Sequence, residues 1–83
     1  MYKIALIPSV QKDLDHFDHK IFAQIQEKVE SLSENPRQQG SLKLTAQEGY
    51  RLRSGDFRIL YRIDDSNKVV YIYRIKHRKD SYR

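Results

Sequence analysis

The stretch YRLRSGDFRILYRI, residues 50–63, decides the fold of this chain of 83 residues. Large apolar side chains alternate there with arginines. The arginines are Arg51, Arg53, Arg58 and Arg62. An alternation with a period of two indicates a strand with one covered and one open face. Because Ser54-Gly55 interrupts the alternation once, we predict a two-residue turn there, between antiparallel strands over 50–53 and 56–64.

The first part of the chain has a helical pattern after a short strand. Residues 2–7, YKIALI, form an apolar run that predicts a buried strand, and Pro8 is tolerated in the first turn of a helix that follows. Asp18 is a good N-cap for a second helix, which Asn35-Pro36 ends. The apolar positions of the two helices each recur on one face. They are Val10, Leu14 and Phe17 in the first, and Ile21, Ile25, Val29 and Leu32 in the second.

The remaining segments complete an α+β pattern. Residues 36–49 are polar and irregular and predict a connecting loop, anchored by Leu42 and Leu44. A turn at 64–68 leads into a last strand over 68–76. The order β-α-α-β-β-β predicts two helices packed on one face of a small, mainly antiparallel four-stranded sheet. The length allows a single domain, residues 1–83.

Charge divides the chain into two unequal halves. Residues 1–49 carry six Lys or Arg against seven Asp or Glu, a net charge of −1, whereas residues 50–83 carry ten against four, a net charge of +6. A basic half predicts a polyanionic partner, nucleic acid first and an acidic protein second. The chain has no cysteine and its three histidines lack ligand spacing, so we expect neither a metal nor a cofactor. No apolar run reaches the length of a membrane span or a signal peptide, which predicts a cytoplasmic protein without a membrane partner.

The predicted register gathers arginines on the sheet face away from the helices. With Ser54-Gly55 as the turn, Arg53 pairs with Asp56 and Arg51 with Arg58; with Ile63 opposite Val69, the row extends from Arg58 to Arg74. Like charges in opposite positions destabilise a sheet. One interpretation is a solvated face on which long side chains splay apart. The other is a phosphate-binding surface, which the excess of arginine over lysine after residue 49, seven to three, favours.

The whole chain resembles the RelE toxins of bacterial and archaeal toxin–antitoxin systems, endoribonucleases of the RelE/ParE superfamily. The resemblance is strongest in YRLRSGDFRILYRI and in the tail IKHRKDSYR, and architectural in residues 1–49. It implies a toxin that enters the ribosomal A site and cleaves mRNA without metal, through the 2′-hydroxyl of the RNA. Arg58 matches the family's arginine in GDFR, Arg78 the arginine of the HR motif and Tyr82 the tail tyrosine. Relatives often continue into a helix beyond that tyrosine, whereas this sequence ends at Arg83.

Cleavage of RNA by its own 2′-hydroxyl calls for the kinds of side chain that these positions carry. Cleavage by the 2′-oxygen requires a base, an acid and stabilisation of extra charge on phosphorus, and arginine supplies that stabilisation. Tyr82 as the base must become a phenolate, although tyrosine ordinarily has a pKa of about 10. Histidine ordinarily titrates near neutral pH, so His77 competes for the role of acid or base, although alternation places it on the face of Phe57. The candidate catalytic residues are thus Arg58, Arg78, Tyr82 and His77.

Further side chains are candidates for RNA binding, and alternatives remain for several. The predicted RNA-binding residues are Arg51, Arg53, Arg62, Arg74, Lys76 and Lys79. Asp56 and Asp80 are interpreted as turn or salt-bridge residues. Tyr61, Tyr71 and Tyr73 are interpreted as sheet and core aromatics, with base stacking as the alternative.

The resemblance also implies partners, and it leaves other functions open. The partners are a cognate antitoxin, the ribosome and mRNA, with a toxin–antitoxin heterotetramer as one assembly. A ParE-like toxin would share the fold but inhibit DNA gyrase by binding. A domain without catalytic activity would bind only nucleic acid or the antitoxin.

Overall fold

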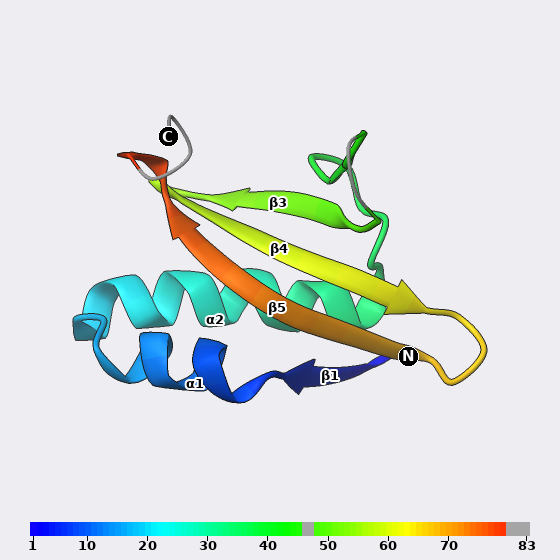
Figure 1. Ribbon diagram of the computed structural model, residues 1–83, viewed down its shortest axis with the longest axis horizontal. Helices are drawn as coiled ribbons and strands as arrows, with labels where there is room; N and C mark the ends of the chain where they lie inside the picture. The colour runs from blue at the N-terminus through cyan, green and yellow to red at the C-terminus, as the bar shows by residue number, and fades with distance from the viewer. Residues whose placement is uncertain (46–47, 80–83) are drawn as a thin grey trace.

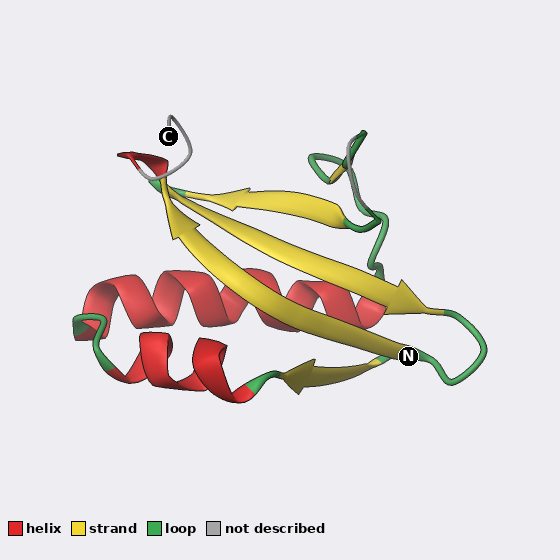
Figure 2. Ribbon diagram, in the orientation of Figure 1, coloured by secondary structure: helices red, strands yellow, loops and turns green. Residues whose placement is uncertain are grey.

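The computed structural model describes residues 1–45 and 48–79, and it contains two helices and five strands. Figures 1 and 2 show both helices on one side of a twisted sheet. The helices are α1 (Pro8–Asp15) and α2 (His19–Glu34). The strands are β1 (Lys3–Leu6), β2 (Leu42–Lys43), β3 (Tyr50–Ser54), β4 (Phe57–Asp64) and β5 (Val69–His77). The predicted α+β class and the order of the main elements are confirmed.

The sheet has five strands in the order β1-β5-β4-β3-β2, one more than predicted. β1 is parallel to β5, and the other pairs are antiparallel. The additional strand, β2, lies inside the segment predicted as a loop and pairs Leu42 with Arg51. Leu42 is 53% exposed, so the prediction that it anchors the loop is wrong. Its backbone is held by pairing with β3, and a strand of two residues is too short to show an alternation in its sequence.

Local signals explain both helices. Pro8 occupies the first turn of α1, where its missing N–H leaves no hydrogen bond unmade. The Asp18 side chain accepts a hydrogen bond from the Ile21 N–H (3.0 Å) and caps α2 as predicted, and the helix ends before Pro36. The apolar stripes pack against the inner face of the sheet. Their buried members are Val10, Leu14, Ile25, Val29 and Leu32, together with Leu52, Ile59, Tyr61, Val70, Ile72 and Ile75 from the strands.

The β3–β4 turn is one residue later than predicted. Ser54 belongs to β3, where it pairs with Phe57, and Gly55-Asp56 makes the turn. Gly55 has a φ of 58°, which suits the first position of a primed turn and which residues with a Cβ adopt poorly. Ser54 is only 4% exposed, and its hydroxyl donates to the Gln24 carbonyl oxygen of α2 (3.4 Å). This tertiary contact keeps Ser54 in the strand.

A β-bulge divides β5 into two parts. Leu60 pairs with Arg74 whereas Tyr61 pairs with Ile72, so Tyr73 is an extra residue on β5. Before the bulge, Ile72 faces the helices; after it, the alternation is shifted by one and Ile75 faces them. Because of the bulge, Arg74 points away from the helices, and the residues after it continue the alternation from that position.

Candidate functional site

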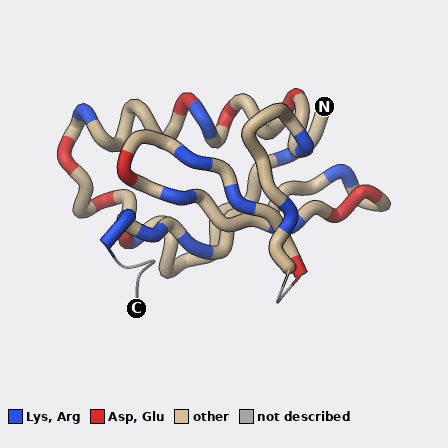
Figure 3. Tube along the Cα trace, turned by 90° about the horizontal axis from the view of Figure 1, so that it is seen from above, with Lys and Arg blue, Asp and Glu red and all other residues tan. Residues whose placement is uncertain are grey.

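Six cationic side chains from three neighbouring strands share the sheet face that points away from the helices. We call it the basic face: Arg51, Arg53, Arg58, Arg62, Arg74 and Lys76. Each alternates along its strand with residues of the core, so it points to the opposite side. Figure 3 shows the basic positions following neighbouring strands, while the acidic positions lie in helices, turns and strand ends.

Two rows of paired positions cross the basic face. In the first, Arg53 lies opposite Arg58, and Arg58 opposite Lys76. In the second, Leu60 lies between Arg51 and Arg74. The predicted row of Arg51, Arg58 and Arg74 is therefore wrong in its pairings. The β3–β4 turn is one residue later than predicted, Ile63 pairs with Val70 instead of Val69, and β5 has a bulge. The prediction that these arginines share one face is correct.

Leu60 forms an apolar floor in the middle of the basic face. It is only 7% exposed, although it does not belong to the core on the helix side. Its neighbours on this face are arginines, whose hydrocarbon stems cover apolar surface while the guanidinium groups remain in solvent. An apolar floor lowers the local dielectric, so an anion bound there interacts with the guanidinium groups more strongly than it would in open water.

The basic face has no carboxylate partners in the part of the chain that the structure describes. The only salt bridge there joins Arg37 to Asp65, outside this face. A hollow of about 250 Å³ opens beside the first row and is lined by Gly40, Leu42, Arg51, Arg53 and Arg58. Three guanidinium groups around one hollow suit a phosphate group, because each can donate two parallel hydrogen bonds.

The first residues of the tail lie at the same end of the sheet as Arg58. β5 ends at His77, and the Arg78 N–H donates to the Asp56 carbonyl oxygen in the β3–β4 turn (2.6 Å). Arg78 and Lys79 are exposed. The other two residues predicted for the tail, Asp80 and Tyr82, lie outside the described residues. The backbone bond thus holds the start of the tail beside the first row of the basic face.

His77 lies on the other side of the sheet. It pairs with Phe57, whose ring it meets edge-on at a centroid distance of 5.0 Å, and Phe57 packs against the core on the helix side. Its Nδ1 accepts a hydrogen bond from the Lys79 N–H (3.1 Å). The structure therefore separates the His77 ring from the Arg58 side chain, as strand alternation predicts.

Arg62 and two tyrosines lie at the other end of the basic face. Arg62 pairs with Tyr71, and both line a hollow of about 400 Å³ with Ile7, Glu48 and Tyr73. Tyr71 and Tyr73 are half-buried. Tyr61, by contrast, belongs to the core and is 0% exposed.

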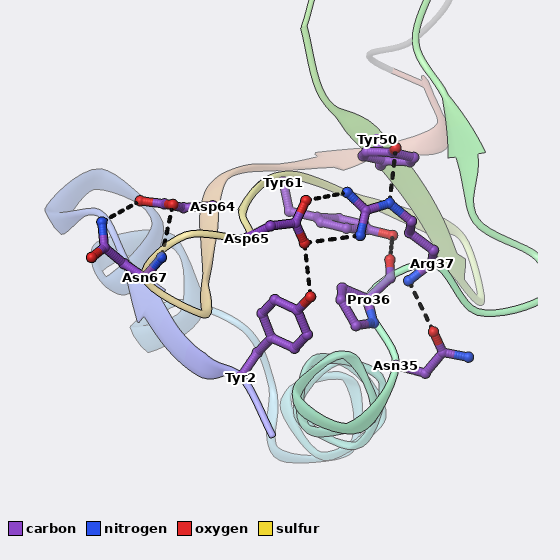
Figure 4. A network of polar contacts seen from close by, with 9 residues as sticks. All are labelled: Tyr2, Asn35, Pro36, Arg37, Tyr50, Tyr61, Asp64, Asp65 and Asn67. Carbon is purple, nitrogen blue, oxygen red and sulfur yellow. Dashed lines mark hydrogen bonds and ion pairs between the residues drawn. The ribbon is translucent and has the colours of Figure 1, made fainter.

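A second polar cluster, which sequence reasoning missed, is formed by Tyr2, Arg37, Tyr50 and Asp65 (Figure 4). We call it the Arg37 cluster. The guanidinium group grips both oxygens of Asp65 (3.1 and 2.8 Å) and lies over the Tyr50 ring, 5.7 Å from its centroid. Hydrogen bonds from Arg37 and Tyr2 lower the pKa of Asp65 to about 2. The residues are 63 positions apart at most in the chain, and no local motif connects them.

Tyr61 supports this cluster from the core. Its ring stacks on Tyr50 at a centroid distance of 5.8 Å, and its hydroxyl donates to the buried Pro36 carbonyl oxygen (2.6 Å). Burial raises the pKa of Tyr61, so it remains a neutral hydrogen-bond donor. The cluster thus ties the loop after α2 to the sheet.

The described residues offer neither a metal site nor a membrane-spanning helix. Residues 1–45 and 48–79 contain no group of three side chains suited to hold a metal ion. Neither helix in that part of the chain is long and apolar enough to cross a membrane.

Comparison with known proteins gives a consistent set of relatives. A family model described as the ParE toxin of the type II toxin–antitoxin system parDE matches residues 4–82. Toxin RelG of Mycobacterium tuberculosis is 33% identical over 99% of this chain and 97% of its own length. Toxin RelE of the same organism is 36% identical over 99% of this chain and 87% of its own. The crystal structure of the M. tuberculosis toxin–antitoxin complex RelBE2 contains a chain with a TM-score of 0.82 and 31% identity, over 93% of this chain and 98% of that one.

Proposed function

The chain belongs to the ParE toxin family and is a RelE-like toxin of a type II toxin–antitoxin system, and from this premise we propose that it is a metal-independent endoribonuclease. Its substrate in this proposal is mRNA in the ribosomal A site, and its effect is the inhibition of translation in the cytoplasm. The observation that carries the proposal is the basic face, on which cationic side chains of three strands lie in register without carboxylate partners among residues 1–45 and 48–79.

The first row of the basic face is suited to bind the scissile phosphate. Arg58 is on the central strand of the sheet, between Arg53 and Lys76, and it is half-buried. Neighbouring cations repel one another, and an anion placed among them relieves that repulsion. The extra charge on five-coordinate phosphorus is larger than the charge of the ground state, so these groups stabilise the transition state more than the substrate.

The proposed reaction is an attack within the RNA. The 2′-oxygen bonds to phosphorus and the bond to the 5′-oxygen breaks, which leaves a 2′,3′-cyclic phosphate. A base takes the proton of the 2′-hydroxyl, and an acid gives a proton to the departing 5′-oxygen. We assign Arg58 and Arg78 to charge stabilisation. Tyr82 is our candidate for the base, since His77 lies on the far side of the sheet from Arg58.

The other cations have a binding role in this proposal. Arg51, Arg53, Arg62, Arg74, Lys76 and Lys79 hold the RNA backbone. This small number of side chains cannot by itself hold a flexible RNA strand in the reactive geometry. We therefore expect free RNA to be cut slowly, and the ribosome to orient the strand that is cut.

An antitoxin is the proposed protein partner. The relative of known structure named above was crystallised as a toxin–antitoxin complex. An acidic, amphipathic segment of a cognate antitoxin would complement the basic face. Such a complex should weaken as salt is added, and an affinity independent of salt would exclude charge as its basis.

Cell-free translation tests the nuclease proposal. Breaks in the message are mapped for the wild type, for Arg58→Ala and for Lys20→Ala, which removes an exposed cation from α2. We expect cuts spaced by codons with the wild type and with Lys20→Ala, and their loss with Arg58→Ala. Messages that stay whole in the presence of folded wild type would overturn the proposal.

A second candidate is a ParE-like toxin that inhibits DNA gyrase by binding, because the family model that matches is that of ParE toxins. The same preparations are assayed for supercoiling by gyrase. Whole messages together with arrested supercoiling would establish this candidate. A third possibility is a binding domain without catalytic activity. In that case Arg78→Ala and Tyr82→Ala would change only the affinity for nucleic acid or for the antitoxin.

A further inference from the structure

The hollow at the far end of the basic face differs from the phosphate site. Its lining residues are Ile7, Glu48, Arg62, Tyr71 and Tyr73, and we call it the tyrosine pocket. At about 400 Å³ it is larger than the hollow beside Arg53 and Arg58. Its walls combine two aromatic rings and an aliphatic side chain with one acidic and one basic group. Flat apolar walls with a few polar groups suit a planar heterocycle.

The chain holds the pocket in shape through Gly49. A Cβ at this glycine would lie 2.9 Å from the Tyr61 carbonyl oxygen and 3.2 Å from the Tyr73 hydroxyl oxygen, so only glycine allows the backbone to approach so closely. The φ of Gly49, 128°, also disfavours other residues. The Leu44 N–H donates to the Gly49 carbonyl oxygen (2.9 Å). Glu48 is thereby held near β5, the strand that carries both tyrosines.

The polar groups of the tyrosine pocket are not used within the described protein. Glu48 and Arg62 both line it, yet neither forms a salt bridge with a described residue. The Tyr73 hydroxyl is buried and has no hydrogen-bond partner, the one such side-chain group among the described residues. Buried polar groups in folded proteins are nearly always paired, so the Tyr73 hydroxyl requires a partner from outside the described residues, either a water molecule or a ligand.

We infer that the tyrosine pocket binds a base of the RNA near the cleaved phosphate and favours bases with an exocyclic amino group over uridine. This inference rests on the proposed function. Tyr71 and Tyr73 offer stacking surfaces, which accept any base. Glu48 accepts hydrogen bonds only, so it pairs with an amino group and repels the carbonyl oxygens of uracil. Arg62 holds the neighbouring phosphate.

The position of the pocket fits an RNA strand that also reaches Arg58. Arg62 is four residues beyond Arg58 on β4, and side chains two residues apart on a strand share a face. The two sites are therefore on the order of 13 Å apart along the same face, within the span of a few nucleotides of extended RNA. Between them lies the row of Arg51, Leu60 and Arg74, and the described strands place no acidic residue on that face between the two sites.

The first experiment compares the bases that flank the cuts made during cell-free translation. The variants are Glu48→Gln and its control Glu30→Gln, which changes an exposed glutamate of α2. We expect Glu48→Gln to reduce the preference for amino-bearing bases over uridine at one flanking position about tenfold, with cleavage retained. Unchanged base preference with Glu48→Gln, while Arg58→Ala abolishes the cuts, would overturn the pocket inference and leave the nuclease proposal intact.

The second experiment measures binding without cleavage. The probe is a single-stranded RNA with 2′-O-methyl groups, which lacks the nucleophile, and with 2-aminopurine at one position. Stacking on an aromatic ring quenches 2-aminopurine fluorescence. We expect quenching by the wild type and by Tyr71→Phe, and affinity about tenfold lower with Tyr71→Leu. The control, Phe22→Leu, alters an aromatic side chain of α2. Equal binding by Tyr71→Leu and the wild type would contradict the inference even if the protein cuts no message.

Discussion

Arg37 and Arg58 show two uses of the same side chain in one small domain. Arg37 grips both oxygens of Asp65 and lies over the ring of Tyr50, so its charge and its planar group are both satisfied within the protein. Arg58 lies in register with two other cations and has no carboxylate partner among the described residues. Pairing within the chain indicates a structural role, whereas cations aligned without partners indicate a ligand. This comparison predicts that changes in the two regions affect different measurements.

The largest effect is expected at Arg58. Arg58→Ala should lower the rate of mRNA cleavage by about 100-fold or more, since it removes a preorganised donor to the charged transition state. The cleavage rate of Arg58→Lys should lie between those of the wild type and Arg58→Ala, because an ammonium group keeps the charge but cannot donate two parallel hydrogen bonds to two oxygens. Arg37→Ala is the matched control and should retain cleavage per folded molecule. The measurement is the rate of message breakage in cell-free translation. Equal losses of this rate in Arg58→Ala and Arg37→Ala would contradict the distinction between the two regions.

The next effect concerns stability alone. Tyr61→Phe removes the donor to the buried Pro36 carbonyl oxygen and should lower the free energy of unfolding by about 1 to 2 kcal/mol. For a domain of this size, Tm should fall by roughly 5 to 15 °C. Thermal unfolding followed by circular dichroism measures the change. Tyr2→Phe, which removes an exposed hydroxyl from the same region, should have a much smaller effect.

A smaller effect is expected in the salt dependence of RNA binding. The logarithm of affinity for single-stranded RNA should decrease linearly with the logarithm of salt concentration, by about 0.7 for each phosphate contact. Arg53→Gln should therefore reduce this slope by about 0.7. Arg37→Gln should leave the slope unchanged, because its guanidinium group already has a partner. Titrations at several salt concentrations measure the slope, and a reduced slope with Arg37→Gln would contradict the assignment of the two regions.

The smallest effect is the pH dependence of the Arg37 cluster. The pKa of Asp65 is about 2 in the folded protein, below the value of about 3.9 in an unfolded chain. Folding is thus favoured while Asp65 is ionised: the contribution is complete above pH ~4 and is lost as the pH falls toward ~2. Asp65→Asn should lower Tm slightly at pH 7, and the difference from the wild type should vanish near pH 2. A difference that grows on acidification would exclude this linkage.

Much of the fold was predictable because its strongest patterns are local. The helical stripe through Ile25 and Val29, the cap at Asp18 and the stop at Pro36 each have a physical cause within a few residues. The alternation of β4 likewise identified the face that carries Arg58. The β2 strand, the position of the turn and the bulge were not predictable in the same way. They depend on pairing and on contacts such as Ser54 with Gln24, which are remote in sequence.

The candidate site was predicted in part for the same reason. Alternation along each strand gave the common face of Arg51, Arg58 and Arg74, but the pairings across strands depend on the register, which a single shifted residue changes. The Arg37 cluster was missed because its members come from distant segments. The tyrosine pocket requires the close approach of Gly49, which composition does not reveal.

The bulge at Tyr73 decides which changes in length β5 can accept. Tyr73 is the extra residue, so loss of its codon would place Arg74 directly after Ile72 and leave Arg74, Ile75 and Lys76 on their present faces. Loss of the Ile75 codon would instead bring Lys76 to the position that faces the helices. Lineages of this gene should accordingly tolerate a deletion at Tyr73 far more readily than a deletion at Ile75, although either removes only one amino acid.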